Sequence, residues 1–578
     1  AEDGIRDRSP SRGLGDVYKR QALGSADMST QVPPPDPQHD INDIARQLDL
    51  PSTALRTYGR DKAKIDVTAL GPLQRRGKLV LVSGITPTAA GEGKTTTAIG
   101  LADGLRLIGQ RAVVILREPS LGPIFGQKGG GTGFGRSRII PTADINLHFN
   151  GDFHAITAAH NLLSAMVDNH LHHNLEPQLD PDRITWKRAL DVNDRALRSV
   201  EVGRGKGNGP VHASGFDITA ASEIMAILAL SENADDLRAR LSRIVIGHDK
   251  EGKEITAAQI RAIGAMMALL RDAMQPNLAA TLEGTPAIVH CGPFANIAHG
   301  TASIAAMKVG LHTADIGVVE AGFGFDLGGE KFFDLVMRGG PMSPAAVVII
   351  VSLRALRLHG GVAADQVATP NQAAVVAGLP NMIRHIENAS LFKRPVIIAL
   401  NAFPHDSVAE VTEVRAAAER AGASFAVIDA TMRGAEGGVA LAQVVTAALA
   451  GPDPGPAPTL YAPDAPLREK IERVATSIYR ATSVVLSDEA TAQLADLEAR
   501  GYGKLPVCMA KTPASFSDDP SRINTPEGHT LTVRRFELAA GAGFVIALCG
   551  TIMRMPGLPR EPRALAIDLV GNTIVGVE

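Results

Sequence analysis

The sequence predicts an α/β fold: a P-loop-type, doubly wound, mostly parallel sheet in a large nucleotide domain, joined to two smaller α/β domains. From residue 78 onward, short β-branched runs alternate with longer helical patterns, which favours strand–helix–strand units. The runs are apolar throughout rather than at every second residue, as is typical of parallel strands covered on both faces. A glycine-rich loop between the first run and a helix is the third observation.

Eight apolar runs are expected to form strands. In chain order they cover residues 79–82, 112–116, 287–290, 316–319, 346–351, 396–400, 425–428 and 544–548. Helical patterns lie between many of them. One example is 257–274, where Thr256 is a possible N-cap.

The chain has 578 residues, enough for roughly three to four domains of about 150 residues. Residues 1–27 show no apolar period, so we interpret them as a non-native or disordered prefix. The Pro- and Gly-rich stretch 451–466 predicts a boundary, because it sustains neither a helix nor a central strand. We expect a large nucleotide-binding domain over 28–360, a second α/β domain over 361–460 and a C-terminal α/β domain over 461–578.

Composition excludes several classes of protein. Apolar residues make up 45% of the chain, which is too many for a disordered protein. Lys and Arg number 58 against 61 Asp and Glu, so the dense basic face of a nucleic-acid binder is not expected. The apolar run 345–351 is too short to span a bilayer. Three cysteines without a CxxC pair fit a reducing compartment, so we expect a cytoplasmic protein with no nucleic-acid or membrane partner.

A phosphate-binding loop is predicted after the first apolar run. Glycines let backbone N–H groups approach an anion, and the helix that begins near Thr95 adds partial positive charge. Lys94 would lie against the outer phosphates of a nucleotide, and the Thr95 hydroxyl would hold Mg²⁺. The strict pattern has glycine where Thr88 stands, and a glycine-rich turn without a ligand is the alternative. The candidate ATP-binding residues are Thr88, Ala89, Ala90, Gly91, Glu92, Gly93, Lys94 and Thr95.

A second candidate group follows the run 112–116. Arg117 and Glu118 stand at the carboxyl end of this predicted strand, the edge where open α/β sheets bind ligands. An arginine there can hold a carboxylate or phosphoryl group through two parallel hydrogen bonds. Lys128 precedes three glycines, and this segment could close over an anion. A flexible surface loop is the alternative.

Ten ordered blocks from about Asp40 to the C-terminus resemble the formate–tetrahydrofolate ligase (10-formyltetrahydrofolate synthetase) family. Two are similar to its nucleotide-site signatures, TPTAAGEGKTTTAIGLADGL and REPSLGPIFGQKGG. The others are DINLHFNGDFHAITAAHNLL, WKRALDVNDRALR, GFDITAASEIMAIL, GPFANIAHG, EAGFGFDLGGEKFFD, RALRLHGG, GYGKLPVCMAKT and MPGLP. Any one block is a weak signal, but ten in order are very specific.

The resemblance implies an ATP-dependent ligation of formate to tetrahydrofolate that gives 10-formyltetrahydrofolate, ADP and phosphate through formyl phosphate. MgATP and tetrahydrofolate are the implied ligands, a monovalent cation (K⁺ or NH4⁺) assists, and the family is typically homotetrameric. One alternative is a P-loop ATP-dependent ligase that uses another carboxylate or acceptor. A non-catalytic nucleotide-binding protein is the other, although it would need a broken site.

The same resemblance implies roles for individual residues. Lys94 would neutralise phosphate charge, and Arg117 would hold formate and then formyl phosphate. Glu118 would lie near the cation site. Asp152 and His148 are candidate catalytic residues in the same cleft, together with Asp144 as a lining residue. A hydrogen-bonded structural role for His148 is about equally expected. The six histidines between His148 and His173 lack the HxxxH or HExxH spacing of a metal site.

The resemblance also implies an aromatic folate pocket with one departure from the family pattern. Phe323 and Phe403 would stack on the pterin ring, although core packing is the alternative for both. Thr431 stands where the family has a tryptophan, so we expect weaker folate binding or a preference for a different polyglutamate or acceptor. Met432 could compensate through sulfur–ring contact.

Three residues of the C-terminal part are assigned from their surroundings. Cys508 and Cys549 lie in or beside apolar runs and are expected to be buried small hydrophobic residues rather than nucleophiles. Lys511 is expected either to contact a ligand carboxylate or to lie on the solvated surface.

Overall fold

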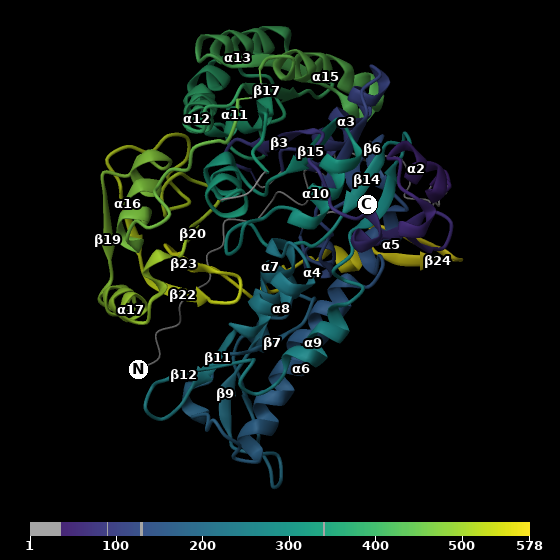
Figure 1. Ribbon diagram of the computed structural model, residues 1–578. Helices are drawn as coiled ribbons and strands as arrows, with labels where there is room; N and C mark the ends of the chain where they lie inside the picture. Colours follow the sequence, from purple (N-terminus) through teal and green to yellow (C-terminus); the bar gives the residue numbers. More distant parts are fainter. Residues whose placement is uncertain (1–35, 89–90, 128–130, 339–341, 453, 578) are drawn as a thin grey trace.

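The computed structural model describes residues 36–577 apart from 89–90, 128–130, 339–341 and 453. Its centre is a twelve-stranded sheet (Figure 1). Seven neighbouring strands of this sheet are parallel. Their spatial order is β14 (Pro286–Val289), β4 (Ala112–Leu116), β15 (Ile316–Glu320), β3 (Lys78–Gly84), β16 (Ala346–Val351), β17 (Val396–Asn401) and β18 (Ser424–Ile428).

Antiparallel strands extend the sheet beyond β14. β13 (Asn277–Thr281) pairs with β14, and β2 (Lys62–Ile65) and β1 (Leu55–Tyr58) follow. β6 (Ser137–Ile140) also pairs with β13 and carries β5 (Gly133–Phe134). These strands bring the N-terminal part of the chain beside the parallel sheet.

Helices cover both faces of the parallel part, so the doubly wound architecture is confirmed. Leu79 and Leu81 of β3 belong to one buried core, whereas Val80 and Val82 face the other. The second core includes residues of α3 (Lys94–Leu107) and α15 (Ala435–Leu449), which pack together closely. A Cβ on Gly438 would lie 2.0 Å from the Gly100 carbonyl oxygen, so this approach of the two helices requires glycine.

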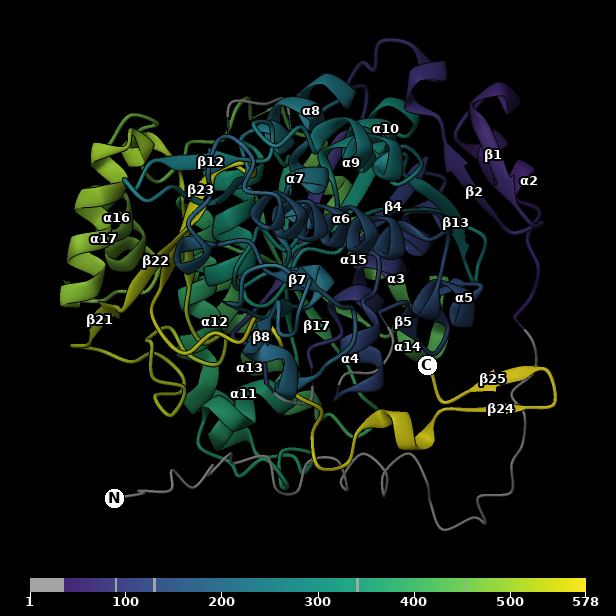
Figure 2. The same cartoon turned by 90° about the horizontal axis from the view of Figure 1, so that it is seen from below.

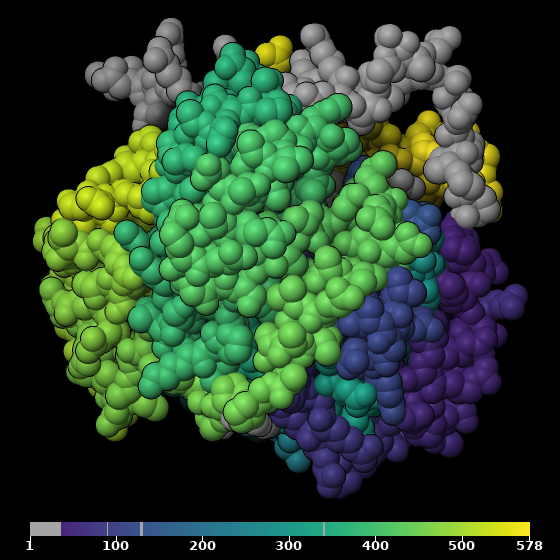
Figure 3. Space-filling model, turned by 90° about the horizontal axis from the view of Figure 1, so that it is seen from above, coloured from purple at the N-terminus to yellow at the C-terminus, as the bar shows by residue number. Residues whose placement is uncertain are grey.

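The first seven predicted strands lie in the parallel sheet, with bounds that differ from the predictions by at most two residues. The parallel sheet continues across residue 360, because β16 and β17 are hydrogen-bonded neighbours. Two helices, α11 (Leu353–His359) and α12 (Gln372–Ser390), connect β16 to β17. A third, α13 (Val408–Arg420), connects β17 to β18. In Figure 3 the green segment that carries α12, α13 and α15 covers the middle of the visible face. The division into three domains stays a prediction.

A largely helical insertion extends away from the sheet between β6 and β13 (Figure 1). It contains α5 (Thr142–Leu147), α6 (Asp152–His172), α7 (Glu223–Leu230), α8 (Ala234–Ser242) and α9 (Ile263–Leu270), with small sheets formed by β7 (Arg188–Ala189), β8 (Val200–Val202), β9 (His212–Ser214), β10 (Phe216–Asp217), β11 (Val245–His248) and β12 (Glu254–Thr256).

The predicted helix over 257–274 is wrong at both ends, because α9 covers only Ile263–Leu270. Thr256 ends β12, which pairs with β11 and so occupies the residue expected to cap the helix. Arg261 has φ 60°, a left-handed conformation that interrupts a helix, and α9 begins only at Ile263.

The C-terminal part forms two further sheets. β19 (Ser483–Leu486) pairs with β21 (Thr530–Val533), and β23 (Phe544–Leu548), the eighth predicted strand, lies between β20 (Val507–Ala510) and β22 (Arg535–Ala539). α16 (Leu467–Ser477) and α17 (Asp488–Ala499) pack beside them, and the hairpin of β24 (Asp568–Val570) and β25 (Thr573–Val575) projects from the body (Figure 2).

The described residues between α15 and α16 carry neither helix nor strand, in agreement with the linker predicted over 451–466. No described helix is long and apolar enough to cross a membrane.

Candidate active site

Three neighbouring strands bring the first candidate residues together. β15 lies between β3 and β4, and all three are parallel, so their carboxyl ends meet at one edge of the sheet. The loop after β3 leads to Lys94, the first residue of α3. Arg117 directly follows β4, and Glu320 is the last residue of β15.

The phosphate loop has the conformation that its glycines predict. Gly91 and Gly93 have φ 77° and 74°, a region that favours glycine, and Gly93 is the N-cap of α3. Glu92 is buried inside the loop, where its carboxylate accepts hydrogen bonds from the Thr88 backbone N–H at 2.8 Å and from the Ser352 hydroxyl at 2.7 Å. Glu92 therefore holds the shape of the loop. Ala89 and Ala90 lie outside the described residues.

Thr95 and Lys94 face the carboxylate of Glu320. The Thr95 hydroxyl donates to Glu320 Oε2 at 2.8 Å. Burial lowers the pKa of Lys94, Arg117 adds to that effect, and the negative charges of Glu92 and Glu320 oppose it. Lys94 is half-buried, and its charge is influenced by two carboxylates and a guanidinium, so it is suited to receive a further anion that would offset the cost of removing its positive charge from water.

Arg117 is held by long contacts that leave donors available. Its Nη2 is 3.5 Å from Glu320 Oε1 and its Nη1 is 3.4 Å from the Pro293 carbonyl oxygen, both beyond the usual hydrogen-bond length. Its Nε has no partner among the described residues. A Cβ on Gly322 would lie 3.2 Å from Nη1, so the guanidinium rests against backbone that carries no side chain. This geometry leaves Arg117 able to take a carboxylate.

Glu320 is a site residue that the sequence predictions missed. It ends a fully buried apolar strand and is followed by a glycine-containing loop. An acidic residue at the carboxyl end of the strand beside a phosphate loop is the signal that would have identified it.

Glu118 and Asp152 lie in a second cluster with Lys64 and Asn277. The Lys64 ammonium is 2.6 Å from Asp152 Oδ1 and donates to Asn277 Oδ1 at 2.9 Å. The Asn277 amide donates to Asp152 Oδ2 at 2.7 Å. Burial and the neighbouring Asp152 raise the pKa of Glu118 well above its usual range. All four residues are buried, so this cluster is sealed, whereas the cluster at Arg117 is partly open.

His148 lies apart from these contacts. Its ring is exposed, and its Nδ1 is 2.9 Å from His154 Nε2. Asp144 is also exposed and is paired with Lys62. The catalytic role of His148 stays a prediction. Lys128 lies outside the described residues.

The first predicted folate residue has an unusual backbone. Phe323, in the loop after β15, has φ 59° and is half-buried. Positive φ is a genuine outlier for a bulky residue, and such strain is concentrated at functional sites. It is therefore not an ordinary core phenylalanine.

The other two predicted folate residues follow neighbouring strands. Phe403 comes after β17 and is half-buried, with the Arg354 guanidinium 4.1 Å from its ring centroid. Thr431 lies in the short helix α14 (Ala430–Arg433) after β18, and its carbonyl oxygen accepts from the Arg136 N–H at 2.9 Å. Met432 is 62% exposed. These residues share the carboxyl edge of the sheet with Phe323, and their contact with folate stays a prediction.

Both expectations for Lys511 are wrong. Its ammonium is fully buried, 2.8 Å from Asp326 Oδ2, and it also donates to the carbonyl oxygens of Thr512 and Ser515. All three donors are therefore used inside the protein. Cys508 and Cys549 are buried as predicted, and burial raises the pKa of each thiol.

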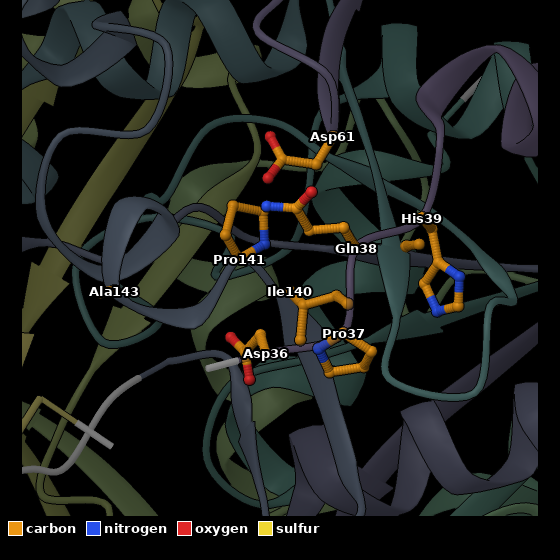
Figure 4. Close-up of a pocket in the computed structure, with 9 residues that line it drawn as sticks. Asp36, Pro37, Gln38, His39, Asp61, Ile140, Pro141 and Ala143 are labelled. Atoms are coloured by element: carbon orange, nitrogen blue, oxygen red, sulfur yellow. The ribbon is translucent and has the colours of Figure 1, made fainter. Parts of the chain in front are cut away.

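A separate surface pocket lies at the antiparallel edge of the sheet (Figure 4). Its lining includes Asp36, His39, Asp61, Pro141 and Ala280. Asp36 is already paired with Arg138 at 2.9 Å, and none of the lining residues belongs to the clusters described above. This pocket is therefore separate from the residues at the ends of β3, β4 and β15.

Residues 29–578 match the family model described as formate–tetrahydrofolate ligase. Similar proteins include the formate–tetrahydrofolate ligase of Maricaulis maris, 52% identical over 532 residues, which are 91% of this chain and 95% of the relative. That of Zymomonas mobilis is 49% identical over 541 residues, covering 93% and 97% of the two chains. That of Staphylococcus aureus strain Newman is 48% identical over 533 residues, covering 92% and 96%.

Proposed function

The chain belongs to the formate–tetrahydrofolate ligase family and is therefore an ATP-dependent enzyme that joins formate to tetrahydrofolate. We propose that the reaction takes place where Lys94, Arg117 and Glu320 meet. One observation carries this assignment. Glu320, at the end of β15, influences the charge of Lys94 on the phosphate-loop side and contacts Arg117, which has an unpartnered donor among the described residues, on the side of β4. A ligase that uses another carboxylate is not favoured, since relatives over nine-tenths of the chain carry the same name.

In the first step, a formate oxygen attacks the γ-phosphorus of ATP, the bond from phosphorus to the β,γ-bridging oxygen breaks, and ADP leaves. Two anions must approach each other, so the protein has to neutralise charge and align the groups. Lys94 lies against the phosphoryl oxygens, and Arg117 binds formate through its free donors. The Thr95 hydroxyl and the Glu320 carboxylate are hard oxygen ligands that fit the Mg²⁺ of MgATP.

In the second step, N10 of tetrahydrofolate attacks the formyl carbon of formyl phosphate. The bond between that carbon and the phosphate oxygen breaks, so inorganic phosphate leaves with one oxygen that came from formate. N10 loses its proton, for which the departing phosphate is a sufficient base. Arg117 holds the phosphate during this exchange, because its guanidinium can bind an oxyanion as well as a carboxylate.

Folate binds on the aromatic side of the same edge. Phe323 and Phe403 supply stacking surfaces, and each offset-stacked pair contributes about 0.5–1.5 kcal/mol. Thr431 offers no ring, and the exposure of Met432 leaves little sulfur–ring contact to replace it. We therefore expect weaker tetrahydrofolate binding than a tryptophan at this position would give.

The charge balance of the sealed cluster is the observation that supports a role for a monovalent cation. Glu118 and Asp152 carry two potential negative charges against one positive charge on Lys64, so a proton or a monovalent cation such as K⁺ or NH4⁺ can balance the remainder. Asp152 then acts by positioning rather than by contact with substrate. A homotetramer in the cytoplasm is proposed on the family resemblance.

A coupled assay tests the function. The protein is mixed with MgATP, formate, tetrahydrofolate and K⁺, then acidified, and the absorbance of 5,10-methenyltetrahydrofolate is measured. Lys94→Ala and Arg117→Ala should each lose most of the rate, because each removes a charge used chiefly in the transition state. Retained turnover in both variants would disprove the assigned roles.

A further inference from the structure

Thr86 is a buried residue between β3 and the phosphate loop, and three buried side chains converge on it. Its hydroxyl oxygen is 3.0 Å from the Asn381 amide nitrogen and 3.1 Å from His385 Nε2. Its carbonyl oxygen is 3.1 Å from His359 Nε2. The backbone that enters the phosphate loop is therefore held by side chains of α11 and α12.

The donor in each of these bonds follows from its partners. A carbonyl oxygen only accepts, so His359 Nε2 carries a proton and donates to Thr86. His359 Nδ1 then accepts from the backbone N–H of Asn524 at 3.3 Å. The Asn381 amide also donates to the Asn524 carbonyl oxygen at 3.0 Å, which fixes the orientation of that amide. These two side chains thus join Thr86 to the C-terminal part, although Asn381 Oδ1 has no hydrogen-bond partner among the described residues.

His385, the third side chain at Thr86, does not make all of its possible hydrogen bonds. Thr86 Oγ1 accepts from Asn381, and among the described residues its own proton finds an acceptor only in His385 Nε2. This pairing places the proton of the neutral ring on Nδ1. Burial lowers the pKa of His385 to about 3, which keeps the ring neutral. Among the described residues, His385 Nδ1 has no hydrogen-bond partner.

A matching acceptor lies close to this ring. Asp326 Oδ2 is bound to Lys511, but Asp326 Oδ1 has no partner in the described part of the chain. Both groups border Gly324: a Cβ there would lie 2.5 Å from Asp326 Oδ1 and 3.2 Å from His385 Cε1, the ring atom between Nδ1 and Nε2. A buried donor and a buried acceptor without partners cost free energy, and a bond between them would recover it.

We propose that Thr86, His385 and Asp326 form a hydrogen-bond relay that couples folate binding to ATP binding. Gly324 directly follows Phe323, so this inference rests on the proposed stacking of folate on Phe323. Folate binding shifts Phe323 and Gly324, and the His385 Nδ1–H then donates to Asp326 Oδ1. The completed relay fixes Thr86 and, through it, the backbone of the phosphate loop. His385 is a positioning residue, because it acts through Thr86.

Equilibrium binding measures this coupling directly. MgATP is titrated calorimetrically into the full chain without formate, so that no turnover occurs, in the absence and presence of saturating tetrahydrofolate. The wild-type protein should bind MgATP at least threefold more tightly when tetrahydrofolate is present, and by linkage MgATP should tighten tetrahydrofolate by the same factor. In Thr86→Val and His385→Leu the factor should fall below 1.5.

Two further variants separate coupling from general damage. Thr86→Ser keeps the hydroxyl and should keep the coupling. His160→Gln removes another buried histidine, one that stacks on Trp186, and should also keep it. The relay is overturned if the wild-type protein shows no coupling, or if Thr86→Val and His385→Leu retain it. Either result leaves the proposed function standing as long as Lys94→Ala abolishes turnover, so the two failures are distinguishable.

Discussion

Two charged clusters meet at the end of β4. Each contains a buried polar atom without a hydrogen-bond partner among the described residues, Arg117 Nε in one and Glu118 Oε2 in the other, so the clusters differ in exposure and in contact length. Arg117 Nη2 lies 3.5 Å from Glu320 Oε1, and Arg117 Nε has no hydrogen-bond partner among the described residues. About a fifth of the Arg117 side chain, 21%, is exposed. The next residue, Glu118, belongs to the cluster of Lys64 and Asp152, whose side chains are each 2% exposed and whose bonds measure 2.6–2.9 Å. Successive residues of an extended chain point in opposite directions, which separates the two. We therefore propose that the open cluster exchanges partners with substrate, whereas the sealed one supports the sheet and balances its charge with a proton or a monovalent cation.

The largest expected effect is on stability, in the sealed cluster. Lys64→Met leaves Asp152 and Glu118 buried without a positive charge, and removing one partner of a buried pair costs about 3–5 kcal/mol. Urea denaturation monitored by circular dichroism would show the loss. Lys94→Met, in the open cluster, should change the free energy of unfolding far less. Equal losses in the two variants would remove the distinction between the clusters.

The next effect is on catalysis, in the open cluster. Lys94→Ala and Arg117→Ala should each lower kcat about 10²- to 10³-fold, the usual cost of losing one preorganised group that stabilises transition-state charge. Arg111→Ala is the matched control, because Arg111 lies at the opposite end of β4 and pairs with Asp49 at the surface. Arg111→Ala should keep its rate, and a comparable loss there would point to damage to β4 rather than to chemistry.

Glu320→Gln should lower kcat about 10- to 100-fold. The amide keeps the size of the side chain but removes the negative charge that orients Thr95 and Arg117, and a hydrogen bond to a charged group is worth about 1.5–3 kcal/mol. Steady-state assays with varied MgATP and formate would measure the change. An unaltered kcat would place Glu320 outside the machinery despite its position.

The smallest effect concerns folate. Thr431→Trp should lower the Michaelis constant for tetrahydrofolate about 2- to 10-fold, since one stacked ring contributes about 0.5–1.5 kcal/mol. Thr431→Val serves as the control for losing the hydroxyl without adding a ring. If the tryptophan variant binds tetrahydrofolate no better than Thr431→Val does, the stacking explanation of this position is wrong.

Local patterns predicted much of this molecule. Continuous apolar runs located the parallel strands, and the glycine-rich loop placed Lys94 at the start of α3, because both signals depend on adjacent residues. The sealed cluster was not predictable in this way. Lys64 and Asp152 are 88 positions apart in the sequence, and only the pairing of β2 with β13 brings Lys64 beside Asn277.

The errors have the same origin. Lys511 was expected to meet solvent or a ligand, yet it is buried against Asp326, which lies in a distant part of the chain. The helix over 257–274 was predicted from its apolar period, and β-pairing of Thr256 with Val245 overrode it. Glu320 was visible in the sequence, but its significance depends on β15 lying next to β3.

The central claim is that one site brings formate and the γ-phosphate together so that a formate oxygen attacks phosphorus. Turnover with [18O]formate, followed by mass spectrometry of the inorganic phosphate, tests it most directly. The account predicts one 18O atom in each phosphate released, with the transfer slowed in Arg117→Ala in proportion to its kcat. Phosphate without 18O, formed at the full rate of ligation, would contradict the account.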